Sequence, residues 1–337
     1  MSVKIVGQKI DNMPWQDMPE GFEGPVWRYT ENPIINRNPK KGITRIFNSA
    51  VVYHNDMYYG IFRSEDVSTL PHLRFGTSND GINWKIDDQP LEIYDEDGTR
   101  VYLYYAYDPR ITKVDDTFFI TYCTDFFGPT VGMISTTDFI RFTRRENPFI
   151  PYNRNGVLFP KKFNGEYKIL SRCSDNGHTP FGDIFSSDSP DLIHWGRHRH
   201  VMQRGGNGWW QGTKIGAGPT PIETSEGWLM LYHGVTNTCN GYVYSMGAAL
   251  LDLEQPSKVL YRCKNYILTP ETPYEEVGFV PNVVFPCSCL AHEDGRLAIY
   301  YGAADSVVAL AFTTVDKLVQ YVKENNEVVG ADRELGR

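Results

Sequence analysis

Residues 51–62 read VVYHNDMYYGIF, two apolar segments with the dipeptide Asn55-Asp56 between them. Alternating side chains on both sides of a turn dipeptide of this kind predict a β-hairpin. The same arrangement recurs around four more dipeptides, Asp115-Asp116, Asn164-Gly165, Glu226-Gly227 and Asp294-Gly295. The strands after the five turns are also alike and read MYYGIF, TFFITY, EYKILS, WLMLYH and RLAIYY. We therefore expect five related hairpin units along the chain.

A second element follows three of these hairpins. Asn79-Asp80 precedes Trp84, Thr137-Asp138 precedes Phe142, and Ser187-Asp188 precedes Trp195. Each is predicted to be a turn in which the carboxylate caps backbone N–H groups before an outer strand. Two hairpins in each unit make a four-stranded blade, and the units recur about every 50–70 residues, a period typical of propellers. The sequence thus predicts an all-β, five-bladed β-propeller, a closed ring without exposed edges.

The two ends of the chain differ from the repeats. Residues 1–45 contain several prolines and read as an extended segment before the first hairpin. Residues 314–326 predict a C-terminal helix, since Val315, Leu318, Val319 and Val322 fall on one helical face. No stretch has linker composition, so residues 1–337 are expected to form a single domain. The extended N-terminus and the helix make a homo-oligomer the expected assembly.

Composition excludes several classes of function. The net charge of -8 gives no basic face for nucleic acid or an anionic membrane. No signal peptide or membrane-spanning run is visible, so a cytoplasmic protein is expected. The six cysteines lack the paired spacing of metal ribbons and are expected to be buried free thiols. No metal site is predicted.

The first strand of each propeller blade lines the central channel, so polar residues at the starts of these strands should meet there. The segments at those starts are 48–49, 107–110, 153–156, Lys214 and Phe285. The second strands end in segments 63–66, 124–125, 172–175, 232–234 and 304–305. Together they bring carboxylates and cations from distant parts of the sequence toward one axis. The sequence therefore predicts a single polar site in the channel.

Several of these segments resemble glycoside hydrolase family 130, in particular its mannooligosaccharide phosphorylase branch. The motifs are FNSAVV (47–52), YDPRI (107–111), PYNRNGVLFP (151–160), SDNGHTPFGDIF (174–185), KIGAGPTPIET (214–224), CNGYVYSMGAALLDL (239–253) and PNVVFPC (281–287). They are long and follow one order over nearly the whole chain. The resemblance implies a five-bladed propeller and an inverting phosphorolysis of β-1,4-mannosides that releases α-D-mannose 1-phosphate from the non-reducing end.

The resemblance also implies the roles of individual residues. Asp108 matches the general acid, and the resemblance implies that this acid acts on the glycosidic oxygen through the mannose 3-hydroxyl. The phosphate-binding positions match Arg154, Arg172, Lys214, His233 and Tyr244. The mannose-binding positions match Asn48, Ser49, Arg63, Tyr107, Phe285 and Asp305, and Asp175 and His178 match positions near the acceptor sugar. Inorganic phosphate is the expected co-substrate, and no cofactor is implied.

The residue types suit this chemistry. An inverting hydrolase needs two carboxyl groups roughly 6.5–9.5 Å apart, one as acid and one as base. Phosphate is already an anionic nucleophile, so a phosphorylase can replace the base with a cluster of cations. One acid with several cations therefore favours phosphorolysis over a β-mannoside hydrolase on the same fold. A non-catalytic carbohydrate-binding propeller would not need the acid. The acceptor stays open among mannose, glucose and N-acetylglucosamine, and the β-1,4 linkage, as against β-1,2, rests on the resemblance.

Overall fold

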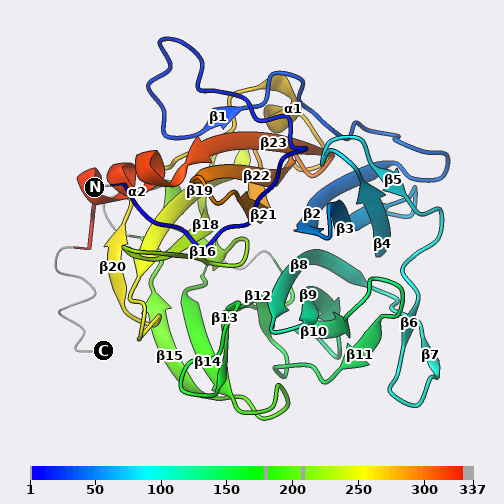
Figure 1. The fold of residues 1–337 in the computed structure, drawn as a ribbon. Coiled ribbons are helices and arrows are strands. Elements are labelled where there is room, and N and C mark those ends of the chain that lie inside the picture. The colour runs from blue at the N-terminus through cyan, green and yellow to red at the C-terminus, as the bar shows by residue number, and fades with distance from the viewer. Residues whose placement is uncertain (1, 178–180, 206–208, 329–337) are drawn as a thin grey trace.

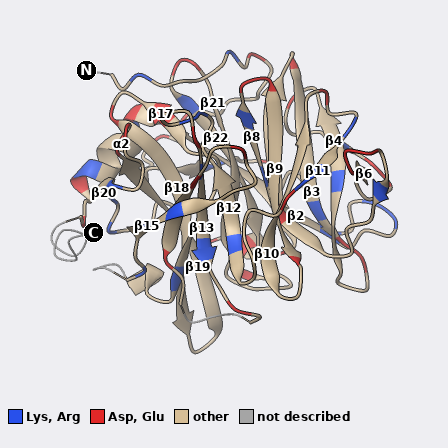
Figure 2. Cartoon of the chain, turned by 90° about the horizontal axis from the view of Figure 1, so that it is seen from below, with Lys and Arg blue, Asp and Glu red and all other residues tan. Residues whose placement is uncertain are grey.

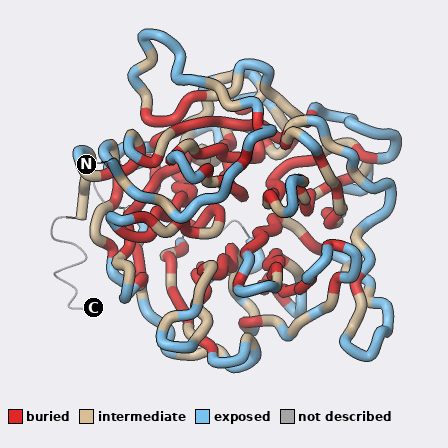
Figure 3. Tube along the Cα trace, in the orientation of Figure 1, coloured by how far each residue is buried: buried red, intermediate tan, exposed pale blue. Residues whose placement is uncertain are grey.

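The computed structural model describes residues 2–177, 181–205 and 209–328. Their strands form five sheets set around a central axis, and each sheet is one blade of a propeller (Figure 1). The inner strand of every blade faces the axis, and the buried residues concentrate in and between the blades (Figure 3). The predicted all-β, five-bladed architecture is confirmed.

Each blade is built on four strands. The second blade has two further strands, and the inner strand of the fourth blade is divided in two. The first blade has β2 (Arg45–His54), β3 (Met57–Glu65), β4 (Pro71–Ser78) and β5 (Lys85–Ile86). The second has β8 (Ala106–Val114), β9 (Thr117–Asp125), β10 (Pro129–Thr136) and β11 (Thr143–Arg145), extended by β6 (Ile93–Tyr94) and β7 (Arg100–Val101). The third has β12 (Asn153–Leu158), β13 (Tyr167–Cys173), β14 (Ile184–Ser189) and β15 (Gly196–Met202). In the fourth, β16 (Lys214–Ala217) and β17 (Ile222–Thr224) both pair with β18 (Gly227–Thr238), followed by β19 (Gly241–Leu251) and β20 (Val259–Arg262).

The fifth blade joins the two ends of the chain. It contains β21 (Val284–Ala291), β22 (Arg296–Ala303) and β23 (Val307–Thr314), and its outermost strand is β1 (Trp27–Arg28). Trp27 pairs with Phe312 across the β1–β23 edge. The N-terminal extension therefore does more than lead into the first hairpin, as its sequence had suggested, because it completes the last blade. It also ends one residue earlier than predicted, since β2 begins at Arg45.

Four of the five predicted turn dipeptides lie between the two inner strands of a blade as expected, and one is shifted. Asn55 and Asp56 join β2 to β3 with φ values of 49° and 58°, a left-handed conformation that Asn and Asp tolerate. In the fourth blade Gly227 pairs with Thr224, so the loop consists of Ser225 and Glu226. Gly227 is thus the first residue of β18 and not part of the turn.

Two of the three predicted capping turns are confirmed. The Asp80 carboxylate accepts hydrogen bonds from the N–H groups of residues 82 and 83, and Asp138 accepts them from residues 140 and 141. The third prediction is wrong, because Asp188 lies within β14 and pairs with Lys168. Asp191 caps this turn, through the N–H groups of residues 193 and 194. In all three turns the carboxylate stands four residues before the packed aromatic residue.

The predicted C-terminal helix is α2 (Val315–Glu324), which Thr314 caps by accepting the Lys317 N–H. The four apolar residues expected on one face are all buried. Two short helices were not predicted, α1 (Pro273–Glu276) and a 3-10 turn, η1 (Trp209–Gln211). None of the helices in the described part of the chain is long and apolar enough to span a membrane. Cys173 and Cys239 are exposed, so the prediction of buried thiols is wrong for these two.

Candidate active site

Three inner strands carry a β-bulge at the same place, near the start of the strand. The pairing shifts between Phe47 and Ala50 in β2, between Tyr107 and Arg110 in β8, and between Arg154 and Val157 in β12. Within these bulges Asn48, Asp108 and Asn155 have φ values of 46°, 51° and 56°. A bulge re-aims a side chain out of the strand alternation, and non-glycine residues with positive φ concentrate at functional sites. The inner strands of three adjacent blades therefore each have one polar residue in a bulge, near the start of the strand, where the channel site is predicted.

Asp108 is buried and held by residues of the first blade. Its Oδ1 accepts a hydrogen bond from Asn48 Nδ2 at 2.8 Å and from Arg63 Nη1 at 2.9 Å. Both hydrogen bonds that described side chains donate to this carboxylate reach the same oxygen. Such donors stabilise the negative charge that remains when a carboxylic acid gives up its proton. The structure thus brings together three of the predicted residues, one of them the candidate acid.

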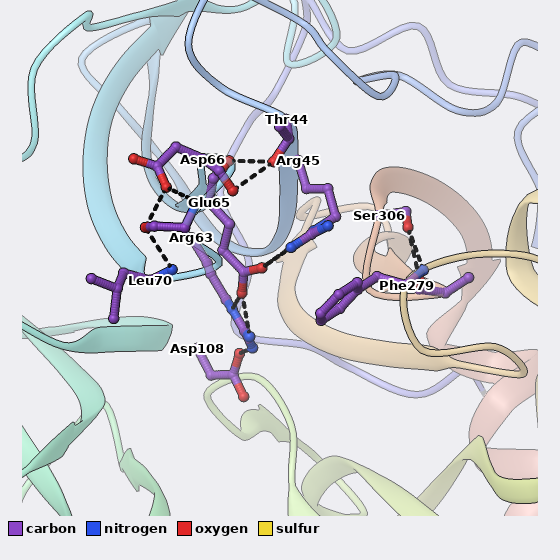
Figure 4. Close-up of polar contacts among 11 residues, drawn as sticks. Thr44, Arg45, Arg63, Glu65, Asp66, Leu70, Asp108, Phe279 and Ser306 are labelled. Carbon is purple, nitrogen blue, oxygen red and sulfur yellow. Dashed lines mark hydrogen bonds and ion pairs between the residues drawn. The ribbon is translucent and has the colours of Figure 1, made fainter.

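A second carboxylate fixes the arginine beside Asp108 (Figure 4). Glu65 is 2% exposed, and its Oε1 accepts hydrogen bonds from Arg63 Nη2 at 2.7 Å and Nε at 3.1 Å. Its Oε2 accepts from Arg45 Nη2 at 2.6 Å. The Arg63 guanidinium also lies over the rings of Phe47 and Tyr107, with its carbon 4.2 Å and 5.1 Å from the ring centroids. Arg63 is therefore fixed on several sides.

Asp305 lies close enough to this network for its charge to matter. Burial raises the pKa of Asp305 to about 7, with Asp108 and Glu65 adding to the rise and Arg63 opposing it. In turn, although burial alone would lower it, the pKa of Arg63 is raised by Asp108, Asp305 and Glu65. Asp305 is therefore protonated for part of the time near neutral pH. When Asp305 is protonated, the two carboxylates that remain are balanced by the two guanidinium groups of Arg45 and Arg63.

His233 links the third and fourth blades and is neutral. Arg172 Nη1 lies 3.0 Å from His233 Nε2, and Asn155 Nδ2 lies 3.5 Å from the same nitrogen. Burial lowers the pKa of His233 well below its usual value, and Arg172, Arg110 and Lys214 lower it further. Because a guanidinium can only donate, Nε2 must be the acceptor and the ring proton resides on Nδ1.

Cations gather around His233. Burial, together with the charges of Arg172 and Arg154, lowers the pKa of Lys214 to about 7. The pKa of Arg172 is lowered by burial and by Arg154. Figure 2 shows basic residues on the neighbouring strands β12 and β13, which carry the two arginines. Like charges brought this close in a buried site favour a bound anion.

Several buried donors of this cation cluster find no acceptor within the part of the chain that the structure describes. Among the described residues, Arg154 Nε, Arg172 Nε and His233 Nδ1 are buried and lack a hydrogen-bond partner. A buried donor without a partner costs free energy, and such groups often mark a ligand site. The phosphate dianion presents three unprotonated oxygens, each of which can accept hydrogen bonds from such donors. The arrangement therefore has the charge and the donors that a phosphate requires.

The remaining predicted residues differ in how closely they join these groups. The rings of Phe285 and Tyr244 lie 4.4 Å and 6.2 Å from the His233 ring. Asp175 accepts the Gly177 N–H and raises the pKa of Lys214, opposing the stronger lowering influences there. Ser49 is buried, and its hydroxyl donates a hydrogen bond to the Phe47 carbonyl of its own strand at 3.4 Å. His178 lies outside the described residues.

Four polar residues of the site have no role in the sequence-based prediction: Arg45, Glu65, Arg110 and Asn155. The last three lie in segments that are predicted to reach the channel, and only Arg45 lies outside them. Arg45 and Glu65 are direct partners in the β2–β3 pairing, which the hairpin register around Asn55-Asp56 could have revealed. Arg110 is buried and donates to the carbonyl of Asp108 at 2.6 Å and to that of Gly218 at 3.1 Å. It stood within the YDPR motif but was not assigned a role.

Comparison with known proteins agrees with this picture. The family model for β-1,4-mannooligosaccharide phosphorylase, glycoside hydrolase family 130, matches residues 7–324. The chain is 49% identical to the β-1,4-mannooligosaccharide phosphorylase of Ruminococcus albus, over 97% of this chain and 100% of that protein. It is 33% identical to a 1,2-β-oligomannan phosphorylase of a Thermoanaerobacter species, over 84% of this chain and 95% of that protein.

A solved structure agrees with the same assignment. The β-1,2-mannobiose phosphorylase of Listeria innocua, in complex with β-1,2-mannobiose, superposes with a TM-score of 0.79 at 28% identity. The match covers 89% of this chain and 99% of that one. With the propeller, the site geometry and the near-complete family match in place, the chain belongs to glycoside hydrolase family 130, the mannoside phosphorylases.

Proposed function

We propose that this protein is a β-1,4-mannooligosaccharide phosphorylase that removes the mannosyl unit at the non-reducing end as α-D-mannose 1-phosphate. The observation that carries the proposal is the buried Asp108 near a cluster of cations with buried donors that lack a partner among the described residues; the charges of Asp108 and of these cations both act on the hydroxyls of Tyr107 and Tyr244. The similarity to the Ruminococcus albus enzyme supports the β-1,4 linkage. A hydrolase would have no use for Arg154, Arg172 and Lys214 at this place.

In the proposed reaction, Arg154, Arg172 and Lys214 hold phosphate on the face of the sugar opposite the leaving group. A phosphate oxygen forms a bond to the anomeric carbon while the bond from that carbon to the glycosidic oxygen breaks, which inverts the configuration. Asp108 supplies a proton, passed through the mannose 3-hydroxyl to the leaving oxygen. The site needs no general base and no cofactor, because phosphate is itself the nucleophile.

The other site residues bind the sugar. In this proposal a mannosyl unit lies between Asp108 and the cation cluster and contacts Asn48, Arg63, Asp305, Tyr107 and Phe285. His233 and Tyr244 complete the phosphate side. Ser49 belongs to the mannose pocket in this proposal, and Asp175 and His178 to the acceptor side. A homo-oligomeric state and a cytoplasmic location remain predictions from the sequence.

The decisive assay supplies β-1,4-mannobiose with and without phosphate and measures both mannose 1-phosphate and free mannose. We expect mannose 1-phosphate only when phosphate is present, with little free mannose beyond the released acceptor. Mannosyl-glucose, mannosyl-N-acetylglucosamine and β-1,2-mannobiose serve as comparison substrates. Release of both mannose units as free sugar, at a rate indifferent to phosphate, would identify a hydrolase and overturn the proposal.

Phosphate binding is expected to take up a proton at mildly alkaline pH. Lys214 has a pKa of about 7, so in the free protein it is mainly neutral at higher pH. A bound phosphate dianion favours the ammonium form and raises that pKa, so up to about one proton should enter with each phosphate. For the same reason phosphate affinity should fall as the pH rises further. Calorimetry at about pH 8.5 in buffers of different ionisation enthalpy measures the uptake.

The control for this prediction is a lysine on an inner strand but outside the cation cluster. Lys214→Met should abolish the proton uptake and weaken phosphate binding, whereas Lys113→Met should change neither. Phosphate binding by the unsubstituted protein without proton uptake would show that Lys214 is already charged in the free site.

A further inference from the structure

Phe279 is a half-exposed phenylalanine whose ring lies against a charged residue of the site. It stands in the segment between α1 and β21, and it is 53% exposed. The Arg45 guanidinium lies over this ring, with its carbon 3.8 Å from the ring centroid. Figure 4 shows Phe279 beside the network that leads from Arg45 to Asp108. A cation over the face of an aromatic ring is attracted to it, so Phe279 contributes to how Arg45 is held.

Arg45 begins a series of ion pairs that ends at the candidate acid. Arg45 Nη2 donates to Glu65 Oε2 at 2.6 Å, and Arg63 Nη2 donates to the other oxygen, Oε1, at 2.7 Å. Arg63 Nη1 then donates to Asp108 Oδ1 at 2.9 Å. Because a guanidinium is planar and its donors have fixed directions, the orientation of each group in the series limits that of the next. A change in the orientation of Arg45 is therefore expected to reach Asp108.

Aromatic rings hold both arginines of this series. The Arg63 guanidinium lies over the rings of Phe47 and Tyr107, and the Arg45 guanidinium lies over the ring of Phe279. Of these three rings Phe279 is the most exposed, since Phe47 is buried and Tyr107 is of intermediate exposure. The Arg45 end of the series is therefore nearer to solvent, and the Phe279 ring shields one face of Arg45 from water.

The backbone of Phe279 is fixed to the turn that carries Asp305. The Phe279 N–H donates to Ser306 Oγ at 3.0 Å, and the Val280 N–H donates to the Ala304 carbonyl at 3.3 Å. This turn joins β22 to β23, so the support belongs to the fifth blade. The ring thus reaches the first blade from a backbone that is held independently of it.

We propose that Phe279 is a positioning residue for the candidate acid Asp108 and acts on it through Arg45. The inference rests on the proposed function, which makes Asp108 the acid. Without the ring, water reaches the face of Arg45 and weakens its ion pair with Glu65. Arg63 is then held less firmly against Asp108, and the proton is delivered less effectively. The phosphate-binding residues lie on the third and fourth blades, so phosphate binding should not depend on this ring.

The test is steady-state phosphorolysis of β-1,4-mannobiose by Phe279→Ala, which removes the ring and keeps the backbone contacts. We expect kcat to fall roughly 10-fold, with an unchanged KM for phosphate. On a 4-nitrophenyl β-mannoside, whose leaving group needs no proton, the fall in kcat should be smaller. Phe279→Tyr keeps the ring and should retain kcat. The control is Val277→Ala, which removes another exposed apolar side chain of the same segment and should leave kcat unchanged.

Three kinetic outcomes would overturn the inference. The first is an unchanged kcat in Phe279→Ala, and the second is an equal fall in Phe279→Ala and Val277→Ala. The third is an equal fall on both leaving groups, because the ring would then act on something other than the acid. If free mannose is released in place of mannose 1-phosphate, the same comparisons apply to that hydrolysis. Failure of the proposed function and failure of this inference are therefore separable.

Unfolding by denaturant tests the contact between the ring and Arg45 without any activity. Arg45→Lys keeps the charge but loses the planar guanidinium. Phe279→Ala should therefore lower the unfolding midpoint less in the Arg45→Lys protein than in the unsubstituted one. Equal shifts in the two backgrounds would show that the two side chains are not coupled, and would overturn the inference whatever the kinetics.

Discussion

Asp108→Asn is expected to lower kcat for phosphorolysis of β-1,4-mannobiose by roughly 10³-fold, within the usual range for loss of a general acid. The asparagine keeps an Oδ1 that can accept from Asn48 and Arg63, so the pocket should stay assembled. What it lacks is the proton that the leaving oxygen must receive. Steady-state kinetics should therefore show a large fall in kcat and a small change in the KM for phosphate.

A substrate with a better leaving group distinguishes a general acid from a carboxylate that is only structural. The leaving group of a 4-nitrophenyl β-mannoside is 4-nitrophenolate, which departs without being protonated. The fold-loss of kcat caused by Asp108→Asn should therefore be smaller on this substrate by at least about 10-fold. The control is Asp66→Asn, because among the described residues the Asp66 carboxylate accepts hydrogen bonds from Ser68 alone and points away from Asp108 (Figure 4). An equal loss on both leaving groups would remove Asp108 from the acid role.

Glu65→Gln should destabilise the protein by about 3–5 kcal/mol, the usual result of removing one partner from a buried ion pair. Glu65 neutralises both Arg45 and Arg63, and its side chain is 2% exposed. A glutamine has one oxygen and no charge, so at least one buried guanidinium loses its counter-ion. Denaturant unfolding measures the change as a lower midpoint at an unchanged slope.

A surface ion pair provides the matched control for this prediction. Glu226→Gln removes the partner of Lys323, which is partly exposed, and should cost less than about 1 kcal/mol. Glu65→Gln should also lower kcat/KM, because Arg63 loses the contact that aims it at Asp108. Glu65 is thus a positioning residue. Equal stability changes in the two variants would mean that water screens the Glu65 network.

The sequence revealed the repeat because each blade is built from local interactions. A hairpin such as 51–62 needs only its own turn and its own alternation, and all five were found. The third capping turn was misplaced because Ser186-Ser187-Asp188 resembles a cap in composition. The constant spacing of four residues from Asp to the packed aromatic would have selected Asp191.

Features that depend on distant pairing could not be found in this way. β1 is two residues long, and its partner stands at the other end of the chain. The division of the fourth blade's inner strand into β16 and β17 has no signal in its alternation. The candidate site was better predicted, because the resemblance identified its residues directly. Asn48 and Asp108, for example, lie in β-bulges that the alternation of the sequence does not reveal. Glu65 was missed because its importance comes from burial between two arginines, which only the folded chain shows.

The pairing of β1 with β23 has a consequence for synthesis on the ribosome. Trp27 emerges among the first residues, yet its partner Phe312 is among the last to be made. Until then, four blades form an open arc whose free strand edges can pair with a neighbouring nascent chain. A chain that stops before β23 leaves that arc permanently open. Premature termination near the end of the message should therefore produce insoluble protein, even though Asp108 and the phosphate-binding residues have already been translated.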